Sequence, residues 1–435
     1  MGTDKPRVYL LLGLQLLLLS FSCRKDQPAP QPDAGGRYVN FDHFDRLYQT
    51  VTLANGAEVG TIAIYSNAPD YRLVADPDEG FTCVDDVARA ALLLAAEPDL
   101  GTNLAKQIKL RNLTEFVLQL QAPEGAPGAG YFYNFLWPDK TINKTFTTSV
   151  AEPNFWSWRA FWHLTEVYPY MQRANPGLAA RMQTAIRRIT ANAIRDFGSR
   201  PNDYTLINGV AVPKWLPFGS GTDQAAIMLL SLANVQKQLP SDVVLQLIEQ
   251  LGTGIVAMQY GGPNEFPYGA ILSFENTWHA YASDQSYALL RVGKQLGKPE
   301  WQAAARREID LFYPWLLSQG GLESLAVART GSALTAVRTS QYAQIAYGIR
   351  PMVWAALEAY DQTRDARYAD LAGQLARWFL GANPAGTVMY DRTTGRGYDG
   401  IGVGNQVNRN AGAESTIESL WTFQRLEKYP EVTLN

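Results

Sequence analysis

The feature that most constrains this chain is a repeated pair of amphipathic segments. From about residue 80 onward, apolar residues recur three and four positions apart, which is the spacing of one helix face. Short links join the two members of a pair, whereas long links rich in glycine and aromatic residues join one pair to the next. The pattern predicts helices over residues 83–96, 104–120, 152–168, 176–197, 223–238, 241–258, 284–296, 299–317, 341–360, 366–380 and 413–426.

These segments make five helical hairpins and leave one helix over. Residues 41–50 could supply its missing partner, and a strand-like stretch at residues 59–65 lies between that segment and the first hairpin. A hairpin repeat of about 60 to 70 residues can bury its apolar faces by closing into a ring. We therefore expect residues 39–435 to form one all-α domain, an (α/α)6 toroid of helical hairpins with the long links at one mouth.

Residues 1–22 have the organisation of a lipoprotein signal peptide. Two basic residues precede an apolar run at residues 8–19 that is too short for a stable membrane-spanning helix, and serines lie just before Cys23. We expect the Cys23 thiol to be acylated as the anchor, with a disordered, proline-rich tether at residues 23–38. An ordinary signal peptide that ends near a cysteine is the alternative. The prediction is an exported bacterial lipoprotein of the outer membrane, on its periplasmic face or at the cell surface.

Composition argues against several classes of function. The net charge is −3 and the basic residues are spread along the chain, so nucleic acid is not an expected partner. His43, His163 and His279 are far apart in the sequence, which gives no cysteine–histidine cluster for zinc. Asp391 and Asp399 flank glycines, but too few oxygen ligands follow at the spacing of a calcium loop. We expect no metal and no cofactor.

Polar and often acidic residues begin the first helix of each pair. Serine, threonine and aspartate commonly cap helix N-termini, so capping is one explanation for these clusters. Capping does not explain why the long links adjoin the same helix ends. In a ring of hairpins those ends would share one mouth, where acids and aromatic residues would converge. The candidate catalytic carboxylates at these positions are Asp85, Asp86, Glu152, Asp223 and Glu414.

Four stretches of the sequence resemble a known family. Residues 81–90 (FTCVDDVARA), 131–135 (YFYNF), 378–383 (WFLGAN) and 408–416 (NRNAGAEST) are similar to motifs of a helical toroid domain associated with bacterial glycosyltransferases. The resemblance covers most of the mature chain and implies an (α/α)6 barrel of the six-hairpin glycosidase superfamily. Val87 stands where the family often has asparagine. The resemblance implies this fold rather than one particular reaction.

Carboxylates at a shared mouth suit glycoside hydrolysis. This reaction needs one carboxyl group to protonate the leaving oxygen and a second to activate water or attack the sugar. Asp85 and Asp86 are adjacent, so their repulsion favours protonation of one of them, as a general acid requires. Barrels of this type resemble inverting enzymes more often than retaining ones. We therefore predict a glycoside hydrolase with paired-carboxylate, inverting chemistry.

Two other functions remain open at this stage. His279, with Tyr281 near it, could be the base of a polysaccharide lyase, although such an enzyme needs a basic cleft and only Arg159 and Arg409 are evident candidates. A non-catalytic glycan-binding lipoprotein on the same fold would be favoured if the acids proved to be separated or salt-bridged.

Aromatic and polar residues near the acids are the candidates for substrate binding. A lone aromatic residue is usually part of a core, but several in the links beside acids could stack on sugar rings. The expected partner is a polysaccharide or oligosaccharide, and contact with the membrane would be through the lipid anchor alone. The predicted substrate-binding residues are Tyr133, Trp137, Trp156, Arg159, Trp278, His279, Asp284, Tyr390 and Asn408.

Overall fold

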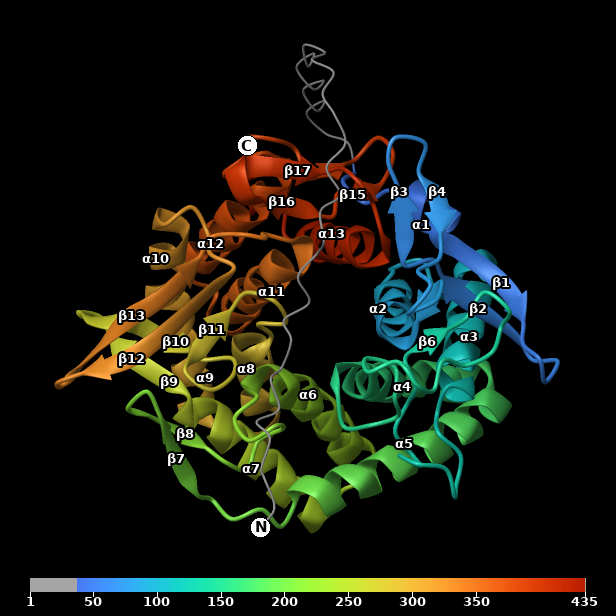
Figure 1. Cartoon of the computed structure of the whole chain (residues 1–435), viewed down its shortest axis with the longest axis horizontal. Helices are drawn as coiled ribbons and strands as arrows, with labels where there is room; N and C mark the ends of the chain where they lie inside the picture. The colour runs from blue at the N-terminus through green and yellow to red at the C-terminus, as the bar shows by residue number, and fades with distance from the viewer. Residues whose placement is uncertain (1–36, 435) are drawn as a thin grey trace, which may run out of the picture. The chain divides into compact units, whose positions relative to one another are not determined.

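Six inner helices form a closed ring in this computed structural model, which describes residues 37–434 (Figure 1). Each inner helix packs on the next in chain order, and the last packs on the first. The predicted signal peptide and Cys23 lie outside the described residues. The inner helices are α2 (Val84–Ala95), α4 (Phe155–Ala174), α6 (Thr222–Gln238), α8 (Gln285–Leu296), α11 (Ala346–Thr363) and α13 (Ala413–Leu426).

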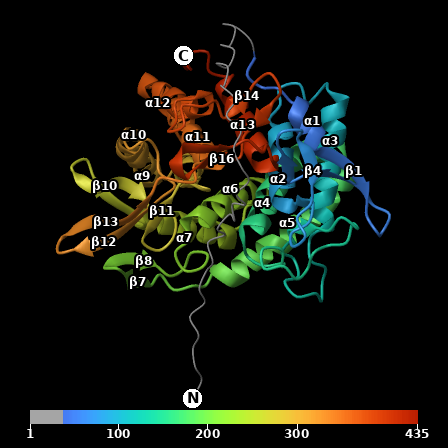
Figure 2. The same cartoon turned by 45° about the horizontal axis from the view of Figure 1, so that its top comes forward.

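An outer layer of helices surrounds the ring and completes the hairpins (Figure 2). Five outer helices each follow an inner helix and pack against it, and the short α1 packs against α13. The (α/α)6 toroid predicted from the sequence is therefore confirmed. The outer helices are α1 (Asp42–Leu47), α3 (Leu104–Gln119), α5 (Pro176–Phe197), α7 (Asp242–Ala257), α9 (Pro299–Arg307), which continues through the π-helical turn Glu308–Phe312 into α10 (Tyr313–Ser318), and α12 (Ala366–Ala376).

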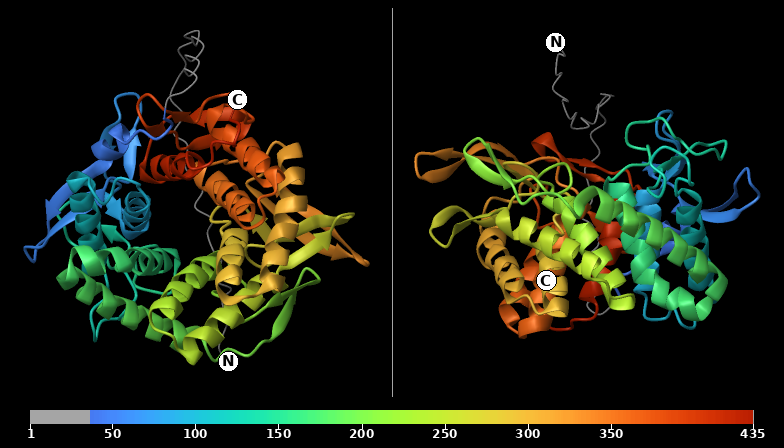
Figure 3. Two further views of the ribbon diagram at one scale, coloured as in Figure 1. Left: turned by 180° about the vertical axis from the view of Figure 1, so that it is seen from behind. Right: turned by 90° about the horizontal axis from the view of Figure 1, so that it is seen from below.

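The long links contain short antiparallel sheets. Most of these strands gather at one side of the ring, as the view from below in Figure 3 shows. The largest sheet has the strand order β11-β12-β13. The strands are β1 (Tyr48–Thr52), β2 (Glu58–Ile62), β3 (Tyr65–Asn67), β4 (Arg72–Val74), β5 (Thr82–Cys83), β6 (Phe135–Leu136), β7 (Tyr204–Ile207), β8 (Val210–Pro213), β9 (Gln259–Gly262), β10 (Glu265–Ile271), β11 (Thr277–His279), β12 (Ser324–Thr330), β13 (Ala333–Ser340), β14 (Tyr390–Asp391), β15 (Arg396–Gly397), β16 (Gly400–Gly402) and β17 (Gln406–Asn408).

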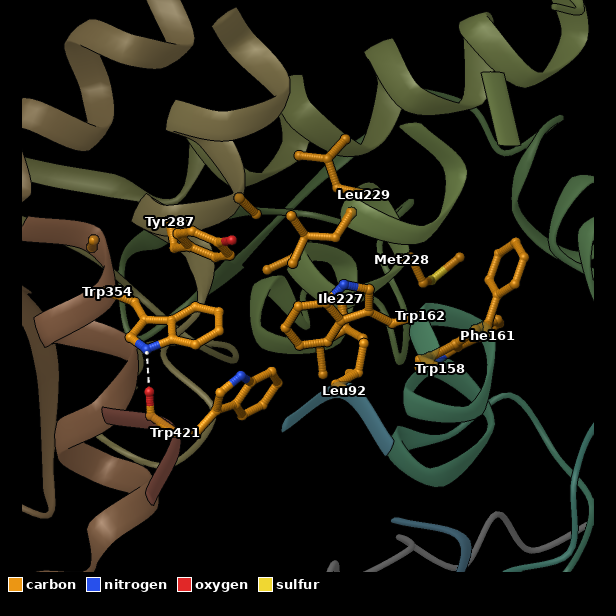
Figure 4. Packing of buried hydrophobic residues seen from close by; sticks show 14 of the residues in the cluster. Leu92, Trp158, Phe161, Trp162, Ile227, Met228, Leu229, Tyr287, Trp354 and Trp421 are labelled. Carbon is orange, nitrogen blue, oxygen red and sulfur yellow. Dashed lines mark hydrogen bonds between the residues drawn. The ribbon is translucent and has the colours of Figure 1, made fainter. Parts of the chain in front are cut away.

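Aromatic side chains from the inner helices meet inside the ring (Figure 4). The ring of Trp421 lies 5.5 Å from that of Trp162 and 4.6 Å from that of Trp354. These three tryptophans and Leu92 are buried. Each lies about two turns after the start of its helix. Two turns into the inner helices, the centre of the ring is therefore filled by a packed core. The polar residues at the helix starts lie on one side of this core, at one end of the ring.

Helices α4 and α11 begin several residues later than the sequence predicts. Helix α4 begins at Phe155 instead of residue 152 and continues past Pro169 to Ala174. Helix α11 begins at Ala346 instead of residue 341, because the backbone of Gln344 exchanges two hydrogen bonds with that of Ile401, at 3.0 and 2.9 Å. That extended pairing keeps the preceding segment out of the helix. Across residues 37–434, none of the helices combines the length and the apolar character that crossing a membrane requires.

Candidate active site

The starts of the inner helices bring acids and arginines together at one end of the ring. These residues are far apart in sequence, but their ion pairs form one connected network. We call this network the central cluster. Its members are the acids Asp85, Asp86, Asp284, Glu414 and Glu418 and the arginines Arg89, Arg159 and Arg350.

The guanidinium group of Arg89 contacts four of these acids. It lies 2.6 Å from Asp86, 3.0 Å from Glu414 and 3.2 Å from Glu418. Its Nε lies 3.6 Å from the carboxylate of Asp85. Only 3% of the Arg89 side chain is exposed, so these charges meet where water screens them weakly. Arg89 therefore holds α2 and α13 together at the point where the ring closes.

Arg159, from α4, forms the second part of the network. Its Nη1 donates to the carboxylate of Asp85, and its Nη2 donates to the Tyr347 hydroxyl at 2.7 Å. The rings of Tyr347, Phe155 and Tyr281 lie 4.7, 5.2 and 5.8 Å from its guanidinium carbon. Asp85 is thus fixed between two arginines. The three aromatic rings, which we call the aromatic wall, pack against the guanidinium group of Arg159.

Arg350, from α11, completes the network. It donates to Asp284 at 2.5 Å and to Glu418 at 2.6 Å, and all three side chains are almost fully buried. Glu418 in turn contacts Arg89, so the charges of α8, α11, α13 and α2 are linked. Asp284 is consequently a structural ion-pair partner here, and its predicted contact with substrate needs correction because solvent does not reach it.

The acids at these helix starts do not act as caps. The sulfur of Cys83 caps α2 by accepting from the Asp86 amide at 3.4 Å. The side chain of Asn134 accepts from the Asp85 amide at 3.2 Å. Helix α13 has no side-chain cap, so Glu414 does not serve as one either. The carboxylates of all three acids are available to the central cluster, which removes the capping explanation for them.

Glu414 differs from the other acids in its exposure and its proton affinity. About a third of its side chain (34%) is exposed, whereas Asp86 and Glu418 are buried. Burial raises the pKa of the Glu414 carboxyl to about 7, with the charge of Asp86 acting in the same direction and Arg89 opposing both. Burial likewise raises the pKa of Asp86. Five acids against three arginines leave a surplus of negative charge, which favours a proton on Glu414 at neutral pH.

A histidine–carboxylate pair lies next to the central cluster. His279 Nε2 lies 3.2 Å from Asp223, and its Nδ1 lies 2.8 Å from the carbonyl oxygen of Tyr281. Burial opposes protonation of the imidazole, but the Asp223 carboxylate prevails and raises the pKa of His279. The ring of Tyr281 packs edge-on against Tyr347, at 4.7 Å, which joins this pair to the aromatic wall.

Comparison with solved structures reveals the same architecture in carbohydrate-active enzymes. A sugar epimerase from a ruminal bacterium matches with TM-score 0.61 and 10% identity over 89% of this chain and 95% of its own. The cellobiose 2-epimerase of Bacillus thermoamylovorans B4167 matches with TM-score 0.59 and 11% identity over 85% and 92%. A GH76 α-mannanase of Bacteroides thetaiotaomicron matches with TM-score 0.52 and 10% identity over 80% and 87%. This chain shares the (α/α)6 barrel fold of these enzymes. No family model and no curated protein matches the sequence significantly.

Three aromatic residues predicted to bind substrate are core residues of the six-hairpin barrel. Trp156 is buried and donates its indole N–H to backbone carbonyls at 2.7 and 3.1 Å. Trp278 is buried against Phe312, with 4.9 Å between ring centroids. Tyr390 is buried and donates to the Tyr38 carbonyl at 2.9 Å. Their assignment to sugar binding needs correction, because none can present a ring face to a ligand.

The remaining predicted residues lie outside the central cluster. Glu152 makes none of its contacts and instead accepts a hydrogen bond from Asn154 at 3.0 Å. Tyr133 is buried beneath Lys144. Trp137 and Asn408 are partly exposed, and their contact with substrate stays a prediction. Among residues 37–434, no group of three or more potential metal ligands is arranged to hold an ion.

Three members of the site escaped sequence reasoning. Tyr347 and Arg350 are the second and fifth residues of α11, and Glu418 is the sixth residue of α13, so all three follow the polar stretches that precede these helices. One signal was available, because a single arginine interrupts an otherwise apolar run in α11, and a buried charge requires a partner. The identity of that partner depends on the closure of the ring, which no local pattern specifies.

Proposed function

We propose that the central cluster is the active site of a glycoside hydrolase in which Glu414 is the general acid. The observation that carries the proposal is the carboxyl of Glu414, partly exposed and with a pKa raised to about 7. A group with this pKa is protonated in a substantial fraction of molecules at neutral pH and can give its proton to the leaving oxygen of a glycosidic bond. The fold agrees with this role, since the similar structures include a hydrolase of α-mannan.

Asp85 is the proposed second carboxylate. It shares the guanidinium of Arg89 with Glu414, so the two acids flank one buried group. Its charge is compensated by Arg159 and Arg89. In an inverting reaction this carboxylate activates a water on the face of the sugar opposite the acid. The inverting course is part of the proposal, and proton NMR of the first anomer released will distinguish it from retention.

A lyase reaction finds less support at this site. Tyr281 would have to accept or deliver a proton beside His279. Burial raises the pKa of the Tyr281 phenol, despite the opposing charge of Arg159, so the phenolate form is disfavoured. The excess of acids in the central cluster also opposes binding of a uronate at that point.

Glycan binding without catalysis is the second candidate function. One observation favours it, since Asp85, Asp86 and Glu414 all form ion pairs in this structure. Such pairs would fix a binding surface without supplying a free acid and base. Turnover separates the two functions, because a binding protein retains its ligand and releases no product.

The deciding experiment is a panel of polysaccharides and oligosaccharides incubated with the purified protein, with detection of new reducing ends. Mannan is included because of the structural match to the mannanase. Cellobiose is included because of the epimerase matches, and its products are examined for an epimer as well as for glucose. Hydrolysis of at least one member supports the proposal. Binding without any new reducing end supports the second candidate.

Replacing Asp85 by asparagine is expected to lower kcat on a cleaved substrate by about 10²- to 10⁴-fold, because the amide cannot act as a base. The matched control is Glu152→Gln, which removes an acid at a neighbouring helix start outside the central cluster and should leave kcat unchanged. Steady-state kinetics and the melting temperature are measured for both variants. Equal losses of kcat in the two variants would show that Asp85 has no special role.

Membrane anchoring through Cys23 is proposed with the function, and Cys23→Ser is expected to release the protein into the soluble periplasmic fraction. The other cysteine provides the control: Cys83 is buried and caps α2, so Cys83→Ser should remain in the membrane fraction. Cell fractionation followed by immunoblotting measures the distribution. Retention of Cys23→Ser in the membrane fraction would exclude the lipid anchor.

A further inference from the structure

A second group of charged and aromatic residues lies on α1, on the turn between β3 and β4, and on the link that leads into α13. We propose that this group, the rim cluster of Arg46, Tyr71, Arg396, Tyr398 and Arg409, binds a carboxylate or sulfate group of an acidic glycan. The inference deepens the proposed function, on which it rests, because it assigns a substrate class to the mouth of the same site.

The rim cluster consists of arginines set against tyrosine rings. The guanidinium carbon of Arg396 lies 3.8 Å from the ring centroid of Tyr71. That of Arg409 lies 5.4 Å from the ring of Tyr398. The backbone of Tyr71 is fixed, because its carbonyl oxygen accepts from Ser66 and Arg46, each at 3.1 Å. The rings orient the guanidinium groups without neutralising them.

These arginines have no carboxylate partners among residues 37–434, in contrast to the arginines of the central cluster. Arg46 donates only to the backbone carbonyls of Asp70 and Tyr71. Arg396 forms no ion pair, and its buried Nε has no hydrogen-bond acceptor. Arg409 is exposed and forms no ion pair within the described chain. A guanidinium in this state can still make charge-assisted bonds to an anion.

Asp391 is the acid that might have neutralised Arg396, since the two are cross-strand partners in β14 and β15. Its carboxylate accepts from the hydroxyl groups of Thr393 and Thr394, at 2.6 and 2.7 Å, and forms no ion pair with Arg396. Burial opposes ionisation of Asp391, but these hydrogen bonds and the charge of Arg396 lower the pKa of its carboxyl group. Asp391 therefore offsets part of the charge of Arg396, and the three arginines of the rim cluster still outnumber this acid.

The rim cluster and the proposed acid belong to one continuous structure. Arg409 precedes Glu414 by five residues, which is at most about 18 Å of chain. The connection is held in place, because Asp399 accepts from the Gly412 amide at 2.9 Å and from Ser415 at 2.8 Å. The α-carbons of Arg409 and Glu414 are therefore no further apart than a glycan of a few units is long.

The two clusters carry opposite charge, and this decides where an acidic unit would bind. The central cluster has more acids than arginines, so it repels a uronate or a sulfate. The rim cluster has three arginines, and Asp391 offsets only part of their charge, so the rim attracts such a group. The occupant that fits both is a glycan that is cleaved next to a neutral unit and carries its acidic group on a unit further along.

Binding measurements on the Glu414→Gln variant test this inference without requiring turnover. The probes are matched pairs in which the charged member carries isolated acidic groups: partly methyl-esterified oligogalacturonates and their fully esterified forms for a carboxylate, and sulfated galactan oligosaccharides and their desulfated forms for a sulfate. Isothermal titration calorimetry gives the affinities. We expect at least one charged member to bind about tenfold or more tightly than its neutral counterpart. The preferred pair tells whether the group is a carboxylate or a sulfate.

Substitutions then locate the bound anion. Arg396→Gln and Arg409→Gln should each weaken binding of the charged probe by about ten- to a hundredfold, while Arg396→Lys should restore part of it. Arg338→Gln, at an exposed arginine of β13, is the control for the loss of one positive charge. Because Arg409 is exposed, its variant should fold even if the Arg396 variant does not.

Three results would overturn the inference: no charged probe binds, the neutral members bind equally well, or Arg338→Gln weakens binding as much as the rim variants do. Failure of the proposed hydrolysis is a separate outcome. In that case the charged probe still binds through the rim cluster, but the wild-type protein releases no reducing ends from it.

Discussion

Replacing Glu414 by glutamine is expected to lower kcat by about 10²- to 10⁴-fold while leaving the fold intact. Glutamine has nearly the same shape, but its amide cannot give a proton to a leaving oxygen. The wild-type enzyme should in addition lose activity above about pH 7, where the Glu414 carboxyl ionises. The measurements are kcat and kcat/KM across the pH range, on a substrate found by the polysaccharide panel.

The stability of the same variant provides a check that is independent of turnover. Burial raises the pKa of Glu414 from 4.5 to about 7 in the folded protein. Between these values the folded state keeps a proton that the unfolded chain releases, so the wild-type protein loses stability as the pH rises through this window. Glutamine does not ionise and avoids that loss. The melting temperature of Glu414→Gln relative to wild type should therefore be higher at pH 8 than at pH 5.

Glu152→Gln is the control for these experiments, because it removes an acid that lies outside the central cluster. If Glu414→Gln retains wild-type kcat, Glu414 is not the general acid. If the variant is inactive but the wild-type enzyme shows no decline in kcat/KM above neutral pH, the catalytic proton resides on another group. Asp223, paired with His279, is then the next residue to replace.

Helical periodicity was sufficient to predict the ring of helices but not the strands in the links between the hairpins. Helices α5 and α13 begin and end at the predicted residues, because proline, phenylalanine and the apolar spacing mark their limits. Strands β12 and β13 were not predicted. They form a local hairpin joined by Gly331 and Ser332, and β12 also pairs with β11, more than forty residues earlier in the sequence. The start of α11 was misplaced because Gln344 pairs with Ile401, a contact between residues far apart in sequence.

The same distinction applies to the site. Asp85, Asp86 and Glu414 could be found from the sequence because each begins an inner helix and lies in a motif. The roles of Trp156 and Trp278 could not, because a tryptophan at a helix start or in a link has the same local pattern whether it is buried or exposed. Burial is decided by the packing of the whole ring. The sequence therefore predicted which helix ends form the mouth of the ring better than it predicted which side chains are exposed there.

Replacing Arg89 by methionine is expected to destabilise the protein by about 3–5 kcal/mol, because it leaves buried carboxylates without their partner. Four acids contact this one guanidinium, and Arg89 itself is 3% exposed. Methionine fills similar space, so the loss reports charge more than volume. Arg89→Lys should recover only part of the stability, since a compact ammonium cannot contact four acids at once. Urea denaturation at pH 7 measures the free energy of unfolding.

The dependence on pH and on a second substitution shows whether charge is the cause. Acidification protonates the orphaned carboxylates, so the difference between Arg89→Met and wild type should shrink as the pH falls from 8 to 5. Adding Glu414→Gln removes one orphaned acid, and the double variant should be more stable than Arg89→Met alone. Arg338→Met, at an exposed site, is the control and should change stability by less than about 0.5 kcal/mol. If Arg89→Met is as stable as this control, the ion pairs of Arg89 are not needed to keep α2 packed against α13. The packed tryptophans inside the ring would then be sufficient to keep it closed.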